Sequence, residues 1–350
     1  IIRGAQFARR LVRRAHLNVV HARSHPAAAM GALATTGTGA RLIFDIRGFL
    51  PEEYADAGIW PAGGHLFRLT KAAERRLLNA ADGFVVLTKH ARRILFADQE
   101  VDERGRPIEV IPCCVDLARF HAAAHLVRAE VREELQLTGR RVAVYVGALG
   151  GFYLTDEMAD FLATAHTADA TTFSLILTQS EPEMIAGRLR ARGVAAQDFL
   201  VRKVAPAEIP RYLKAADFAL SFIKPAYSKL SSSPTKVAEY LAAGLPIVCN
   251  AGIGDVDEVI GGERVGVIIH EFNRAAYLAA LSAVDELRAD AELATRCQRA
   301  AHTYFDLEQV GGARYRRLYR RLLDVSSNGN LLDEQRAPAA APTNAGAGEN

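Results

Sequence analysis

The chain has 350 residues, of which 50% are hydrophobic and 24% are charged, and its formal net charge is +3. This length allows two domains of ordinary size, and the composition is that of a globular protein. The small net charge argues against a nucleic-acid partner, and no apolar run is long enough to span a bilayer. No signal peptide is visible, and the four cysteines show no metal-ligand spacing. We therefore expect a cytoplasmic protein with free thiols and no metal site.

Strand-like and helical patterns alternate along the first third of the chain, which predicts an α/β fold with parallel strands. The expected strands are residues 18–21, 41–45, 83–87 and 108–111, and the expected helices are residues 26–35, 65–80 and 89–96. A doubly wound domain usually has more strands than this, and the chain begins at Ile1 within a basic helical pattern. We therefore expect the first domain to be incomplete and the true N-terminus to be missing.

A second alternating series follows a charged helix expected at residues 126–135. Its expected strands are residues 141–147, 173–177, 199–201, 218–221, 246–249 and 265–269. The predicted organisation is a first domain at 1–125, a second domain at 126–310, a helix at 311–325 and a tail at 326–350. The tail is rich in Ala, Pro, Gly and Asn and poor in apolar residues, so we expect it to be disordered.

The segment 231–248 carries the clearest functional pattern, which is a polar loop, a short helix, a Gly-Pro turn and an apolar strand. Ser233 and Thr235 lie at the expected helix start, where the helix dipole and free N–H groups favour an anion. Glu239 lies one turn further along, where a carboxylate can accept hydrogen bonds from sugar hydroxyls. The alternatives are that the hydroxyls are plain N-caps and that Glu239 is an exposed helix carboxylate.

Several motifs in this order resemble the retaining GT-B glycosyltransferases of family 4. They are the junction at 110–120, the strand ending at Gly147, the segment 234–246, and the helix-to-strand passages at 73–88 and 212–217. The resemblance covers roughly residues 18–320 and implies two Rossmann-like parallel-sheet domains that face each other across a cleft. It also implies transfer of a sugar, with retention of configuration, from a nucleoside-diphosphate sugar on the second domain to an acceptor hydroxyl from the first. We expect a hexosyltransferase or related enzyme of glycan or polysaccharide biosynthesis, which needs no cofactor and no metal ion.

Two departures from the family pattern bear on this function. The family usually has two glutamates in an E-x7-E pattern, and here Ser231 stands where the first is expected, although its hydroxyl can still bond a donor sugar. The family also tends to have an Arg and a Lys after the strand that ends at Gly147, and the loop 147–153 has neither. A helix start contributes only about 0.3–1 kcal/mol when exposed. We therefore expect a further cation at the diphosphate, and the candidates are Lys224, Lys229 and Lys236.

The resemblance and the strand ends together give a set of candidate site residues. The predicted donor-binding residues are Gly147, Gly150, Gly151, Lys203, Ser231, Ser233, Pro234, Thr235, Lys236 and Glu239. The predicted catalytic residues are Asp45, Arg47 and Glu239, and the predicted acceptor-side residues are His21, Arg23 and Glu52. The alternatives are that the glycines only form a turn and that Asp45 and Arg47 are a structural ion pair.

The expected partners are the nucleotide-sugar donor and a glycan or lipid-linked acceptor. The Arg-rich helices near residues 9–14 and 314–321 can contact an anionic membrane surface, and a solvated helix face is the alternative. Two other functions stay open, which are a nucleotide-sugar epimerase with the GT-B fold and a non-catalytic sugar-nucleotide-binding protein.

Overall fold

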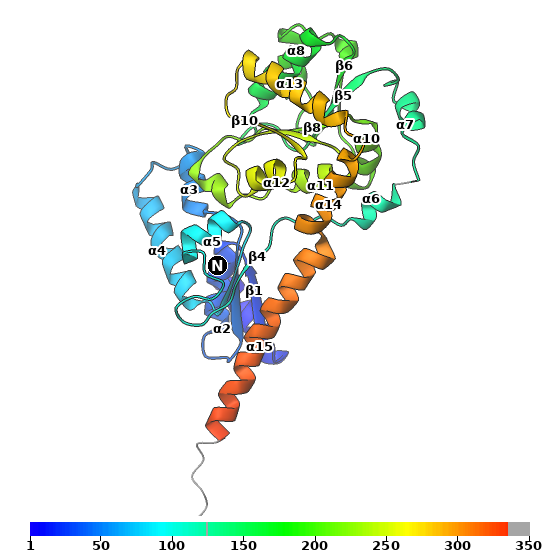
Figure 1. Ribbon diagram of the computed structural model, residues 1–350. Helices are drawn as coiled ribbons and strands as arrows, with labels where there is room; N and C mark the ends of the chain where they lie inside the picture. The colour runs from blue at the N-terminus through cyan, green and yellow to red at the C-terminus, as the bar shows by residue number, and fades with distance from the viewer. Residues whose placement is uncertain (124, 335–350) are drawn as a thin grey trace, which may run out of the picture.

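The apolar strand sequences pair into two separate parallel sheets, one of four and one of six strands, as the alternating pattern predicts. The computed structural model describes residues 1–123 and 125–334. The two sheets belong to two α/β domains that stack against each other, with the first domain below the second in Figure 1. The architecture is that of the GT-B fold.

The first domain has its four strands in the order β1-β2-β3-β4, so each strand pairs with its neighbour in the sequence. Its strands are β1 (Val19–Arg23), β2 (Arg41–Ile46), β3 (Gly83–Val86) and β4 (Ile108–Val110). Its helices are α1 (Ile2–Arg14), α2 (His25–Thr35), α3 (Leu50–Asp56), α4 (His65–Ala80) and α5 (Lys89–Phe96). Phe44, Phe84 and Ile108 lie in register across the sheet and are buried, because parallel strands are covered on both faces.

The second domain has the strand order β10-β9-β8-β5-β6-β7. Its strands are β5 (Arg141–Val146), β6 (Thr172–Leu177), β7 (Phe199–Arg202), β8 (Phe218–Ser221), β9 (Ile247–Asn250) and β10 (Gly266–Ile269). The chain builds outward from β5 to β7, returns to place β8 beside β5, and then builds outward in the other direction. The loops after β5 and β8 therefore diverge at a topological switch point, which is where open α/β sheets bind ligands.

Helices cover both faces of the six-stranded sheet. The linking segment carries α6 (Ala118–Ala122) and α7 (Arg128–Glu134). The second domain carries α8 (Thr155–Ala168), α9 (Glu183–Ala191), α10 (Ile209–Ala215), α11 (Thr235–Ala242), α12 (Val256–Gly262), α13 (Arg274–Arg288), α14 (Leu293–Phe305) and the short helices η1 (Ala196–Asp198), η2 (Pro206–Glu208) and η3 (Tyr227–Ser231).

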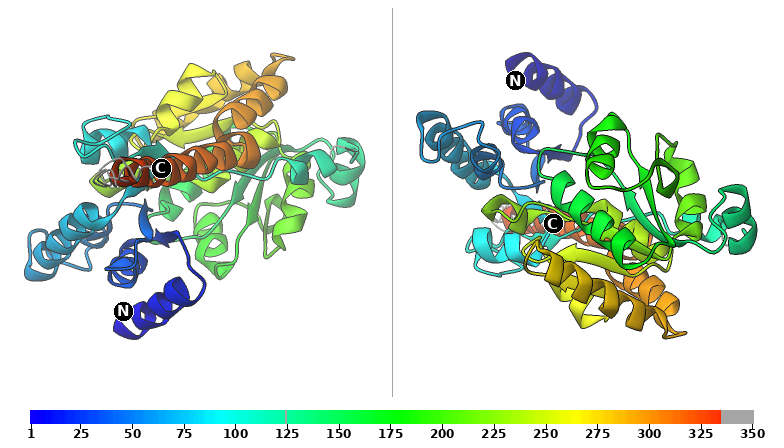
Figure 2. Two further views of the ribbon diagram at one scale, coloured as in Figure 1. Left: turned by 90° about the horizontal axis from the view of Figure 1, so that it is seen from below. Right: turned by 90° about the horizontal axis from the view of Figure 1, so that it is seen from above.

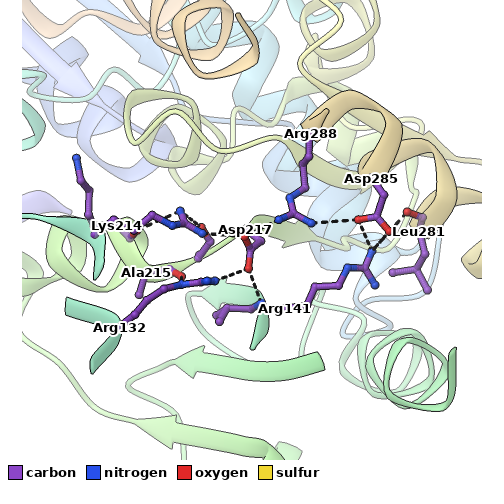
Figure 3. Close-up of polar contacts among 11 residues, drawn as sticks. Arg132, Arg141, Lys214, Ala215, Asp217, Leu281, Asp285 and Arg288 are labelled. Carbon is purple, nitrogen blue, oxygen red and sulfur yellow. Dashed lines mark hydrogen bonds and ion pairs between the residues drawn. The ribbon is translucent and has the colours of Figure 1, made fainter. Parts of the chain in front are cut away.

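A buried carboxylate fixes the edge of the second domain that lies away from the first. Asp217 is 8% exposed, and it accepts hydrogen bonds from Arg132 at 2.5 Å and Arg288 at 2.6 Å. It also accepts the backbone N–H of Val142 at 2.7 Å, at the start of β5 (Figure 3). Since these partners come from α7, α13 and β5, the cluster holds three elements in place without reaching the switch point.

The C-terminal helix returns to the first domain. After α14 the chain passes through η4 (Leu307–Gly312) into α15 (Ala313–Glu334), which runs along the first domain in Figures 1 and 2. Its Leu318 and Leu322 are buried against Ile43 and Val85 of the four-stranded sheet. This contact covers the sheet face that α2 and α4 leave open.

The helix α15 is longer than the sequence predicts. We expected a helix at 311–325 and a disordered tail from 326, but α15 continues to Glu334. Once a helix has formed, each further residue adds a hydrogen bond at little entropic cost, so weak helix formers can be carried along. The rest of the expected tail, residues 335–350, lies outside the described residues.

The described helices are short or polar relative to a bilayer. None of them combines the length and the apolar character needed to cross a bilayer.

Candidate functional site

The candidate donor site lies at the switch point, where the loop after β5 meets the start of α11. Gly147 has φ 141°, a conformation that favours glycine, and a Cβ added there would lie 2.8 Å from Nζ of Lys236. Gly150 and Gly151 follow with φ values of 76° and 61°. Glycines are therefore needed at this loop, and a bare backbone next to a lysine ammonium is suited to a phosphate group.

Lys236 is the most unusual charge in the site. Its ammonium is buried, donates a hydrogen bond to the hydroxyl of Tyr145 at 2.8 Å, and lies 4.0 and 4.2 Å from the ring centroids of Tyr145 and Tyr153. Burial lowers the pKa of Lys236 to about 7, and the negative charge of Glu239 opposes this shift. Because burial disfavours the charged form of Lys236, an anion that enters the loop would stabilise this cation more than it would stabilise an exposed lysine.

Glu239 lies one turn after Lys236 on α11 and is not an exposed helix carboxylate, because its side chain is only 13% exposed. Burial raises the pKa of Glu239, and the charges of Arg119 and Lys236 oppose the shift. Arg119 reaches from α6 to within 3.7 Å of its carboxylate. The sequence places Arg119 in the junction motif at 110–120 but does not indicate that it contacts the candidate donor site.

The start of α11 is joined to the domain junction. Pro234 is the N-cap residue and α11 has no side-chain cap, so the hydroxyls of Ser233 and Thr235 are not plain N-caps. Ser233 instead accepts the backbone N–H of Cys113 at 3.0 Å. Burial raises the pKa of the Cys113 thiol, while hydrogen bonding to Thr235 and the positive charge of Arg23 lower it. Cys113 therefore lies between the helix start and the first domain.

Ser231 lies in the contact between the two domains. It is 2% exposed, donates its hydroxyl proton to the backbone oxygen of Ser228 at 2.6 Å, and accepts the backbone N–H of Phe49 at 3.2 Å. The hydroxyl proton that was expected to serve a donor sugar is therefore already used within the chain.

The predicted acceptor-side residues meet at the carboxyl ends of β1 and β2. Asp45 is 3% exposed, and its Oδ2 lies 3.6 Å from Nε2 of His21 and 3.8 Å from Nε of Arg23. Tyr315 of α15 donates its hydroxyl to the same oxygen at 3.3 Å, whereas Oδ1 is buried without a hydrogen-bond partner. Tyr319 also bonds Nδ1 of His21 at 2.9 Å. Neither tyrosine could be assigned to this group from the sequence, because α15 reaches β2 only in the folded chain.

Three of the predicted residues lie apart from these two groups. Arg47 is exposed, and Glu52 pairs with Lys71 at 2.9 Å on the side of the first domain that carries α4. Lys203 is exposed and pairs with Glu181 at 3.2 Å. The alternative of a structural pair between Asp45 and Arg47 does not hold, since Asp45 faces His21, Arg23 and Tyr315 instead.

Of the three candidate cations, two place the side-chain ammonium next to the glycine loop at 147–153. Lys236 contacts it as described above, and Nζ of Lys229 lies 3.6 Å from the ring centroid of Phe152. Lys229 is 7% exposed and pairs with Glu53 of the first domain at 2.7 Å. Lys224 is exposed and donates to the backbone oxygen of Asp56 at 3.3 Å.

A cavity of about 580 Å³ lies beside the start of α11. It is lined by residues from both domains and from α15, among them Leu87, Ile108, Ser233, Val256 and Arg314. Gly147, Lys236 and Glu239 do not line it, whereas Ser233 and Pro234 of the predicted donor-binding set do, so the cavity adjoins the candidate donor site at the start of α11. Within the part of the chain that the structure describes, no cluster of three or more His, Cys, Asp or Glu side chains is arranged to hold a metal ion.

Comparisons with known proteins bear on the family and the fold of the chain. The family model described as Glycosyltransferase Family 4 matches residues 1–119, and no curated protein matches the sequence. Sucrose-phosphate synthase from Thermosynechococcus elongatus superimposes with a TM-score of 0.72 at 16% identity, over 92% of this chain and 77% of that one.

Two further solved structures have the same fold. Anabaena Alr3699/HepE in complex with UDP-glucose gives a TM-score of 0.65 at 14% identity, over 89% of this chain and 82% of that one. WaaG, a glycosyltransferase involved in lipopolysaccharide biosynthesis, gives a TM-score of 0.59 at 16% identity, over 89% of this chain and 94% of that one. The family match and the structural matches lead to one conclusion: the first domain matches glycosyltransferase family 4, and the chain as a whole has the GT-B fold.

Proposed function

We propose that this glycosyltransferase takes a sugar from a nucleoside-diphosphate sugar bound on the second domain and transfers it, with retention, to an acceptor hydroxyl held by the first. The observation that carries the proposal is the pair Lys236 and Glu239, one turn apart on α11 and next to the glycine loop at the switch point. A diphosphate at the loop would form an ion pair with the ammonium of Lys236, and the ribose hydroxyls would donate hydrogen bonds to Glu239.

The diphosphate needs more than a helix start, which contributes at most about 2 kcal/mol even when partly buried. Lys236 supplies a positive charge in a site from which water is largely excluded, where it acts more strongly than on the surface. The backbone N–H groups of the loop and of Thr235 would complete the pocket. UDP-glucose is the donor to test first, because the HepE structure holds it.

In the proposed reaction the acceptor oxygen bonds to the anomeric carbon on the face from which the diphosphate departs. The bond between that carbon and the phosphate oxygen breaks, and the leaving phosphate takes the proton of the acceptor hydroxyl. Lys236 and the loop N–H groups would stabilise the charge that develops on the leaving group. Asp45, with Oδ1 buried and without a partner, would orient the acceptor.

The proposed acceptor is a glycan or a lipid-linked saccharide, used by a cytoplasmic enzyme at the inner face of the membrane. Helix α1 supports a peripheral contact, because Phe7 is 59% exposed beside several arginines. The Arg-rich part of α15 does not, since Arg317 is bonded to Glu109 and Arg314 to the backbone oxygen of Val110.

A thermal-shift panel of UDP-, GDP-, ADP- and CMP-sugars tests the donor class, and proton NMR of the product tests retention. We expect one nucleotide class to raise the melting temperature and the product to keep the anomeric configuration of the donor. An inverted product would rule out the front-face reaction, and an epimerised donor formed without acceptor would indicate an epimerase instead.

A further inference from the structure

The structure raises the question of which carboxylate faces the donor sugar, since Ser231 stands where the family has a glutamate. Ser231 is buried, and its hydroxyl proton is donated to Ser228. A neutral hydroxyl whose proton is already donated is a weak replacement for a carboxylate, which accepts hydrogen bonds from several sugar hydroxyls.

A carboxylate from the first domain reaches the same place. If Gly48 carried a Cβ, that atom would lie 3.4 Å from Oγ of Ser231 and 4.0 Å from Oε2 of Glu53. The Glu53 carboxylate and the Ser231 hydroxyl therefore lie near each other, on either side of Gly48. Its side chain is 42% exposed, so one oxygen is open to a ligand while Oε1 is held by Lys229.

Helix α3 is fixed in this position by the second domain. Phe49, Glu53 and Asp56 are spaced by four and three residues, so they lie on one face of the helix. Each meets η3 of the second domain. Phe49 donates its N–H to Ser231, Glu53 pairs with Lys229, and Asp56 accepts the N–H of Ser228 at 2.9 Å.

Lys229 links Glu53 to the donor loop. Its ammonium is 2.7 Å from Oε1 of Glu53 and 3.6 Å from the ring centroid of Phe152, which directly follows Gly151. Because one lysine contacts both, the Glu53 carboxylate lies close to the loop at which the donor diphosphate is expected.

We propose that Glu53 of the first domain is a donor-specificity residue, which accepts hydrogen bonds from hydroxyls of the transferred sugar in place of the glutamate that Ser231 replaces. This inference rests on the proposed donor site.

Isothermal titration of UDP-glucose and UDP into the full chain tests this proposal, because the two ligands share every group except the sugar. Glu53→Gln should raise the ratio of the UDP-glucose Kd to the UDP Kd by about tenfold, since hydrogen bonds to a charged group are lost. The free terminal phosphate of UDP carries more negative charge than the diester of UDP-glucose, so Lys229→Gln is measured as well, to give the part of the ratio that depends on the charge of Lys229 alone. Glu53→Asp, which keeps the charge but withdraws the carboxylate, should raise the ratio in the same direction.

The control is Asp56→Ala, which weakens the same contact between α3 and η3 without removing the proposed sugar ligand. It should leave the ratio within about twofold of the unaltered chain. If Glu53→Gln leaves the ratio unchanged, or if Asp56→Ala changes it equally, Glu53 is only an interface residue and the inference is overturned. If the unaltered chain binds neither ligand, the donor site itself is wrong, and this inference falls with it.

Discussion

Individual residues of the donor site owe their properties to neighbours that are distant in the sequence. The sequence was enough to propose Lys236 and Glu239, because both lie in a recognisable segment. It could not choose among Lys224, Lys229 and Lys236, because burial of Lys236 depends on Tyr145 and Tyr153. It also could not show that the Ser231 hydroxyl is used between the domains, since Phe49 and Ser231 come together only through the fold.

The lowered pKa of Lys236 predicts proton uptake on donor binding. The free site holds a lysine with a pKa of about 7, well below the ordinary value of 10.5, because burial disfavours the charged form. A bound diphosphate favours the charged form and raises this pKa, so binding takes up a proton at pH values above about 7. UDP affinity should therefore fall as the pH rises from 7 to about 9.

Calorimetry of UDP binding at pH 8, in two buffers of different ionisation enthalpy, measures this uptake directly. We expect close to one proton for the unaltered chain, none for Lys236→Gln, and an unchanged value for Lys214→Gln, which lies on α10 outside the site. Equal uptake by the Lys236→Gln variant would show that another group is responsible.

At the level of elements, the strands and their parallel pairing followed from the sequence, but two helices at the site did not. Residues 50–56 carry a proline and two glutamates and are not among the expected helices, yet they form α3. The pattern of α15 predicted a helix but not its place on the first domain. Both omissions have one cause, which is that contacts between distant segments decide where a short or amphipathic helix packs.

The packing of α15 predicts a large effect of one leucine on stability. Leu318 is 0% exposed and contacts the open face of the four-stranded sheet, so Leu318→Ala should lower the free energy of unfolding by about 2–4 kcal/mol. Leu323→Ala is the matched control on the same helix, because Leu323 is 39% exposed, and it should cost less than about 0.5 kcal/mol. Urea denaturation measures both variants, and equal effects would mean that α15 does not stabilise the first domain through this face.

For the whole molecule, the GT-B arrangement could be predicted because the motifs occur in a fixed order, and the structural matches confirm it. What the sequence could not supply is how the two domains share the site. Asp45 and Glu53 come from the first domain, Lys236 and Glu239 come from the second, and Tyr315 comes from the returning C-terminal helix. The central claim is that a nucleotide sugar binds between these groups, with its ribose on Glu239.

Titration of UDP-glucose into the unaltered chain and into Glu239→Ala tests that claim most directly, with circular dichroism to show that both proteins are folded. We predict one site per chain and an affinity at least about tenfold weaker for the variant, since it loses hydrogen bonds from the ribose to a charged group. Equal affinity of the two proteins for UDP-glucose would place the donor somewhere other than α11 and contradict the account.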